Sequence, residues 1–405
     1  MKIGAGSMKK ILIFILIALL ILSGCTPKKG DDTVQENDPR LADRTQNAEY
    51  LETDEYYYWR GDGCPYLMYY DKSTDQSGVL CARADCMHNN DPDCWGNIMS
   101  VGTALTMLNG RLYWVGEYNE GEKYYISIMS MNPDSSERRL ERKLDLPDNV
   151  IPHKYFFHHG ELYIYSRFSN VRDGVPSYIE ALYVTSIDNK EIRTVFEREI
   201  PPLEGSGMEF KFIGDSVYYY INSSSENGDG FDYEFYRYDI PSGNEEPLFN
   251  LEGNFTVYGF WPEGEDILIS TVDNETYLSG FYRVRNGQMQ LISDFADEEG
   301  FYVFPRVSDG IVYTTASSEE ISVINIWIKD WEGNTLYKGL LPMGFLDGTE
   351  PEFIGFSSDW GDKNAVFFDH EVGMEDGSVM HYLVRYDIME GGLAEELLIS
   401  EASYN

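Results

Sequence analysis

Residues 214–249, GDSVYYYINSSSENGDGFDYEFYRYDIPSGNEEPLF, are the clearest copy of a unit that recurs along the chain. A Gly-Asp turn leads into residues 217–219, a β-branched and aromatic run that is typical of a buried strand. An acidic, glycine-rich loop at residues 226–232 separates this strand from a second one at residues 235–239. A turn containing proline and glycine then leads into a third strand, which begins at Pro247. The stretch therefore predicts short strands joined by tight turns.

The same unit occurs at six other places, with spacings of 45 to 56 residues between successive copies. If Tyr218 marks the first strand of the copy above, the equivalent residues are Tyr57, Tyr113, Tyr163, Leu268, Tyr313 and Phe367. A further strand precedes the marker in most copies, which gives four strands per copy. Repetition of this kind predicts an all-β fold, a β-propeller of four-stranded blades. Seven blades are the simplest count, and six or eight are the alternatives.

The first copy lacks an obvious innermost strand. Residues 48–51 could supply that strand, or the C-terminal tail could close the ring instead. No stretch after residue 25 has sustained helical periodicity, so a fold that alternates strands with helices is excluded. We expect the propeller to occupy residues 49–405.

The N-terminus has the pattern of a signal peptide. Lys9 and Lys10 precede an apolar run of 12 residues, 11–22, which is too short to cross a hydrocarbon core of about 30 Å as a helix. The sequence Leu-Ser-Gly-Cys that ends at Cys25 resembles the bacterial lipobox, in which the cysteine sulfur carries diacylglycerol. We therefore expect residues 1–24 to be removed, Cys25 to be lipidated, with palmitate among its acyl chains, and the protein to be anchored on the outer side of the cell membrane. An ordinary secretory signal with an incidental cysteine is the alternative.

Residues 25–48 are polar and almost free of large apolar side chains, which predicts a disordered tether. The formal charge of the chain is -38, and loss of residues 1–24 makes it -41, because Lys2, Lys9 and Lys10 are lost with no acid. Such a charge disfavours nucleic acid and anionic lipid headgroups as partners. Proteins, peptides, glycans and cations remain as ligands.

A dense group of potential metal ligands lies at residues 81–94, where Cys81, Cys86, His88 and Cys94 have the spacing C-x4-C-x-H-x5-C. Three thiolates and an imidazole suit a closed tetrahedral zinc site. With Cys64 the same thiols could form two disulfides, and a redox-active thiol is a third interpretation. In a four-stranded blade, the loop between the second and third strands and the connection to the next blade emerge on one face, so all four cysteines are expected there.

Part of this region resembles a known motif. Tyr69-Tyr70-Asp71 through Val79-Leu80-Cys81, followed by Asp85-Cys86-Met87-His88 and by Cys94, is similar to a segment near the start of uncharacterised bacterial lipoproteins that continue into a TolB-like β-propeller. The resemblance implies a surface-anchored propeller without an established activity. Cys64 does not belong to that motif.

Other site signals are weaker. The loops expected between second and third strands are acidic and could bind calcium, with Asp229 and Asp232 as the best local pair. Residues 357–361 resemble the S-x-D-x-G core of a sialidase Asp box, but Asn364 replaces an expected aromatic residue, so we predict a structural turn. No G-x-S-x-G, H-E-x-x-H or Walker motif occurs.

These observations favour a non-enzymatic binding or scaffold module that presents its loop face to a protein, peptide or glycan. The alternative is an extracytoplasmic carbohydrate-active enzyme that uses carboxylates at the propeller channel, which would need two acids about 5 to 10 Å apart.

Overall fold

The computed structural model describes residues 50–61, 64–88, 93–98, 104–120, 123–146, 150–172, 175–187, 189, 191–200, 208–224, 230–295, 304–317 and 323–402. All of them belong to one compact unit, Glu36–Asn405. The predicted signal peptide, Cys25, the tether and Asp229 lie outside the described residues. No helix in the described part has the length and hydropathy that a membrane span requires.

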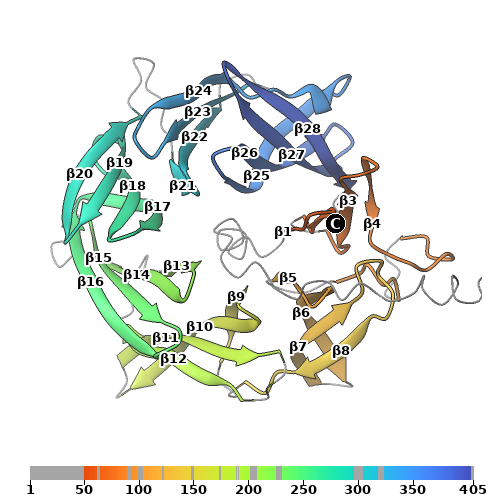
Figure 1. Cartoon of the computed structure of the whole chain (residues 1–405), viewed down its shortest axis with the longest axis horizontal. Coiled ribbons are helices and arrows are strands. Elements are labelled where there is room, and N and C mark those ends of the chain that lie inside the picture. Colours follow the sequence, from red (N-terminus) through yellow and green to blue (C-terminus); the bar gives the residue numbers. More distant parts are fainter. Residues whose placement is uncertain are drawn as a thin grey trace, which may run out of the picture. The chain divides into compact units, whose positions relative to one another are not determined.

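Seven four-stranded antiparallel sheets form a ring, which confirms the seven-bladed β-propeller (Figure 1). Blade one consists of β1 (Tyr50–Glu52), β2 (Tyr56–Trp59), β3 (Met68–Asp71) and β4 (Gln76–Val79). Blade two consists of β5 (Leu105–Leu108), β6 (Arg111–Glu120), β7 (Lys123–Met131) and β8 (Arg139–Lys143). Blade three consists of β9 (Pro152–His158), β10 (Glu161–Arg172), β11 (Val175–Ser186) and β12 (Arg193–Ile200). Blade four consists of β13 (Met208–Ile213), β14 (Ser216–Ser224), β15 (Phe231–Asp239) and β16 (Asn244–Gly253). Blade five consists of β17 (Phe255–Glu263), β18 (Asp266–Asp273), β19 (Ser279–Arg285) and β20 (Gln288–Asp294). Blade six consists of β21 (Arg306–Ser308), β22 (Ile311–Ser317), β23 (Ile324–Asp330) and β24 (Thr335–Leu340), and the short 3-10 helix η1 (Gly344–Leu346) follows it. Blade seven consists of β25 (Pro351–Gly361), β26 (Ala365–Met374), β27 (Val379–Met389) and β28 (Gly392–Ala402).

The repeat marker occupies the same place in every blade, namely the second strand from the channel. Tight turns explain why the preceding strand pairs with it so regularly. Gly110, Gly160, Gly214, Gly264 and Gly310 precede this strand in blades two to six, and each has a positive φ of 55° to 80°. Glycine adopts this conformation without steric cost, so the chain reverses within a few residues.

The ring closes without a strand shared between the two ends of the chain. Residues 50–52 form the innermost strand of blade one, so the predicted alternative in which the C-terminal tail supplies it is wrong. The tail instead forms β28, which completes blade seven. Side chains join the two blades: Tyr70 donates to Glu396 at 2.9 Å, and Arg385 donates to the hydroxyl of Tyr57 at 3.1 Å.

The core is divided among the junctions between blades. Each of seven buried clusters in the described residues combines side chains from two neighbouring blades. The cluster at the closing junction includes Tyr50 and Tyr57 from blade one and Trp360 and Phe367 from blade seven. The aromatic residues of the repeat therefore hold blades together, because a single blade cannot bury both of its faces.

Candidate metal centre

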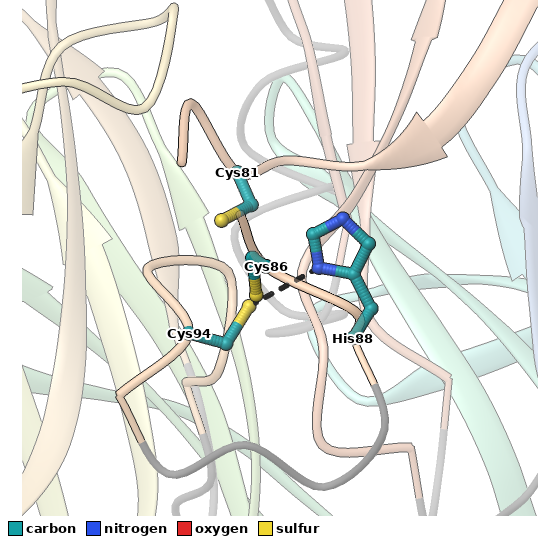
Figure 2. Close-up of side chains that lie close together, drawn as sticks. All are labelled: Cys81, Cys86, His88 and Cys94. Carbon is teal, nitrogen blue, oxygen red and sulfur yellow. Dashed lines mark hydrogen bonds between the residues drawn. The ribbon is translucent and has the colours of Figure 1, made fainter. Parts of the chain in front are cut away.

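The cysteine-rich loop is the connection between β4 and β5, as predicted, and it brings four potential ligands together. The ligand atoms of Cys81, Cys86, His88 and Cys94 all lie within 4.8 Å of one another. Figure 2 shows the sulfurs of Cys86 and Cys94 beside the imidazole of His88. His88 Nδ1 and Cys94 Sγ are 3.5 Å apart. Cys94 is buried, and the other three side chains are half-buried.

Backbone hydrogen bonds fix this loop against blade one. Leu67 N donates to Gly96 O at 2.8 Å, and Ile98 N donates to Pro65 O at 2.9 Å. A side chain at position 96 would not fit, because its Cβ would lie 2.9 Å from the carbonyl oxygen of Leu80. The segment that carries Cys94 is therefore held in place by the folded blade.

The electrostatic environment affects the thiols of Cys81 and Cys94 in opposite directions. Burial opposes ionisation of Cys81, but hydrogen bonds from the backbone N–H groups of Arg83, Trp95 and Gly96 lower the pKa of its thiol overall. Burial, followed by the neighbouring Cys86, raises the pKa of Cys94 to about 12. In the absence of a metal, the pair therefore consists of an ionisable thiol and a protonated one.

A cation lies beside the loop. The Arg138 guanidinium donates to the carbonyl oxygens of Cys94 and Trp95 at 3.0 and 3.1 Å, and it lies 5.5 Å from the ring centre of Trp114. Its positive charge would attract the thiolates of Cys94 and Cys81 once a metal ion had displaced their protons. A centre of three thiolates, one neutral imidazole and a divalent cation carries a net negative charge, which this arginine would balance.

The separation of the ligand atoms is close to that of a tetrahedral zinc site. With bonds of about 2.3 Å to sulfur and about 2.05 Å to nitrogen, the sulfur-to-nitrogen edge of a tetrahedron is about 3.6 Å and the sulfur-to-sulfur edge about 3.8 Å. The observed separation of 3.5 Å between Cys94 Sγ and His88 Nδ1 is close to the first value. None of the four described cysteines is disulfide-bonded in the structure. The four residues could therefore hold zinc with only small side-chain movements.

Cys64 lies in the loop between β2 and β3, as predicted, but it does not belong to this group. Its thiol is buried, and burial, followed by the negative charge of Glu401 in β28, raises the pKa of Cys64. His381 and Asp369, whose Nδ1 and Oδ1 atoms are 3.1 Å apart, and Arg60 complete a buried polar cluster at the closing junction. Sequence reasoning missed this cluster because its members are far apart in the chain and have no characteristic spacing.

This buried cluster predicts a specific pH dependence. Burial raises the pKa of Glu401 from 4.5 to about 7. The folded protein therefore retains a proton that the unfolded chain releases, so folding stability should fall as the pH rises from about 4.5 to about 7 and then stay level. A pKa of about 7 in place of 4.5 corresponds to a change of roughly 3 kcal/mol in the free energy of unfolding over this pH range. Glu401→Gln removes this ionisation, and its unfolding free energy relative to the natural chain should rise by that amount between pH 4.5 and 7.5.

Urea denaturation at several pH values measures this effect. Glu390→Gln, at an exposed position in the turn before β28, is the matched control and should follow the natural pH profile. Parallel profiles for Glu401→Gln and the natural chain would show that the buried carboxyl does not control this pH dependence.

The remaining predicted sites have different outcomes. Asp232 lies in β15, paired with Ser223 and Glu252, and it belongs to no cluster of three or more ligand-type side chains among the described residues. The turn predicted for residues 357–361 is wrong, because these residues form the end of β25 and pair with β26. Strand pairing prevails there over the turn preference of serine, aspartate and glycine.

Comparisons with known proteins identify the fold alone. No family model and no curated protein sequence matches the chain. Among solved structures, it is similar to one from a study of two prolyl endopeptidases, with a TM-score of 0.51, 10% identity, and coverage of 90% of this chain and 52% of the other. For acylaminoacyl peptidase from Pyrococcus horikoshii the TM-score is 0.47 and the identity 11%, with coverage of 89% of this chain and 53% of the other. For an ulvan lyase from a family of polysaccharide lyases the TM-score is 0.49 and the identity 12%, with coverage of 87% of this chain and 94% of the other. The chain thus spans about half the length of the peptidases.

Proposed function

We propose that the chain is an extracytoplasmic, lipid-anchored β-propeller that acts as a binding or scaffold module, with a structural zinc ion fixing the cysteine-rich loop. The observation that carries this proposal is the convergence of Cys81, Cys86, His88 and Cys94 within 4.8 Å. Four protein ligands fill a tetrahedral zinc ion and leave no open position for a substrate. The zinc therefore orders the loop and takes no part in a reaction.

The position of the loop suits a binding role. It joins blades one and two at the face from which all connections between blades emerge. Loops on one face of a rigid scaffold are where binding residues concentrate. A zinc ion would lower the entropy that this loop loses when it contacts a partner, because the loop is ordered beforehand.

The membrane anchor is tested separately from the zinc site. Growth of the source cells with radioactive palmitate should label the natural chain, whereas Cys25→Ala should be unlabelled and released from the membrane. Crosslinking on intact cells should then recover a complex with the natural chain that His88→Ala, which lacks one zinc ligand, forms less well. Labelled and membrane-bound Cys25→Ala would contradict the anchor, and equal crosslinking of His88→Ala would contradict the role of the loop.

One observation favours the alternative, a carbohydrate-active enzyme. Glu209 and Asp359 both line a cavity in the propeller. Each carboxylate is engaged by a cation, however: Lys211 lies 3.6 Å from Glu209, and Arg306 lies 3.6 Å from Asp359. Turnover of a polysaccharide by the natural chain that is lost in both Glu209→Gln and Asp359→Asn would establish the enzyme.

A further inference from the structure

A cavity of about 410 Å³ lies among the strands nearest the propeller axis. Side chains from blades three to seven line it, contributed by β9, β13, β14, β17, β21, β22 and β25. Its volume is within the range of about 300 to 1,000 Å³ that is typical of small-molecule sites. Because five blades build its wall, the cavity is a product of the ring and not of any one loop.

The charge of the lining is opposite to that of the chain. The protein has 31 basic and 69 acidic residues, yet among the described residues the cavity is lined by three cations and two carboxylates. The carboxylates are engaged by two of the cations, Glu209 by Lys211 and Asp359 by Arg306, each at 3.6 Å. Lys154 is exposed and forms no ion pair with any carboxylate that the structure describes. The described lining therefore carries one positive charge that its own carboxylates do not balance.

The rest of the protein limits which anions could use this charge. A long polyanion would extend over the acidic surface and be repelled there. At physiological salt, charges more than about 8 Å away are largely screened, so a small anion inside the cavity experiences mainly Lys154, Arg306 and Lys211. The charge distribution thus favours a small ligand with one negative group.

Aromatic side chains supply the apolar part of the wall. Tyr258 presents a half-buried ring to the cavity and packs against Phe304 with ring centres 4.7 Å apart. Trp360 and Phe210 also line the cavity, whereas Asn222 and Ser308 add polar groups. Aromatic walls with a few polar groups suit a compact ring that is apolar on one face and hydrogen-bonds at its edge.

We propose that this cavity binds a small organic monocarboxylate that contains a ring, with its carboxylate paired to Lys154 and its ring against Tyr258. An acidic monosaccharide and an aromatic carboxylic acid share this chemistry. The inference deepens the proposed binding function by naming a ligand class. It does not depend on the zinc ion or the lipid anchor.

Isothermal titration of the detergent-solubilised full-length mature protein tests the proposal with two matched pairs of probes. Glucuronate is compared with glucose, and phenylacetate with 2-phenylethanol. In at least one pair we expect the carboxylate to bind at least about tenfold more tightly than its neutral partner, with an affinity that falls as salt rises. The pair that shows the preference identifies the sugar or the aromatic acid as the source.

Variants locate the site. Lys154→Gln, at an exposed position that should not disturb folding, should abolish the preference for the carboxylate, whereas Lys338→Gln on the outermost strand β24 should leave it unchanged. The proposal is overturned if neither carboxylate binds more tightly than its neutral partner, or if Lys154→Gln keeps the preference. In either case, crosslinking of a partner to the natural chain on cells would still support the proposed binding or scaffold function.

Discussion

Replacement of Cys94 by serine should lower the affinity for zinc at least about 100-fold, because even loss of a group that only supports a ligand costs up to about that much. Cys94 is the buried member of the cluster, and its sulfur lies 3.5 Å from His88 Nδ1. When zinc is in excess, a hundredfold loss of affinity removes about 2.7 kcal/mol of metal-dependent stability. Urea denaturation with and without a chelator measures this difference, and the effect of the chelator on the variant should be smaller by at least this amount.

Cys64→Ser is the matched control for this experiment. Its thiol is equally buried but lies outside the cluster, under the electrostatic influence of Glu401. Cys64→Ser should therefore retain its zinc and its response to the chelator, whatever stability it loses. If the response to the chelator falls in Cys64→Ser as it does in Cys94→Ser, Cys64 is a ligand and the assignment of the four ligands is wrong.

Phe367→Ala should destabilise the propeller by about 3 to 5 kcal/mol, the usual loss for a large aromatic side chain removed from a core. Phe367 is 3% exposed and lies in blade seven, with its ring centre 5.6 Å from Tyr50 and 6.1 Å from Tyr57 of blade one. This junction joins the two ends of the chain. Loss of the Phe367 side chain should therefore open the ring at this junction. Hydrogen exchange should then show lower protection of the backbone amides in blades one and seven than in the other blades.

Phe212→Ala is the control for that prediction. Phe212 is fully buried at the junction of blades three and four, 5.1 Å from Phe156 and 4.8 Å from Tyr163 between ring centres. The chain passes directly from one of these blades to the next, so the blades stay tethered. A similar free-energy loss with no local opening is expected there. Equal loss of protection around the whole ring in both variants would mean that the closing junction has no special role.

The sequence predicts the repeat well because each blade is encoded locally. Tyr218 and its equivalents all lie in the second strand of a blade, since the period-2 pattern and the turn glycines act within a few residues. Closure was harder to predict. β1 has only three residues, Tyr50–Glu52, and its pairing with β2 depends on contacts with blade seven that no local pattern records.

The candidate site shows the same limit. Cys81, Cys86, His88 and Cys94 are close in the chain, so their spacing predicts their convergence. Cys64 was expected to lie close to these ligands, but it is outside their cluster, and the side chain with the largest electrostatic effect on its thiol is Glu401, more than 300 residues away in the sequence. The lining of the central cavity comes from five blades in the same way. Such sites arise from ring geometry, and a single sequence carries no signal for them.

The state of the cysteine-rich loop in the purified full-length protein is the most direct test of the proposed zinc centre. Native mass spectrometry without added reductant should show one zinc ion per chain, and alkylation after metal removal should modify Cys81, Cys86 and Cys94 as free thiols. Two disulfides among Cys64, Cys81, Cys86 and Cys94 with no bound metal would contradict the zinc centre and the proposed role of this loop.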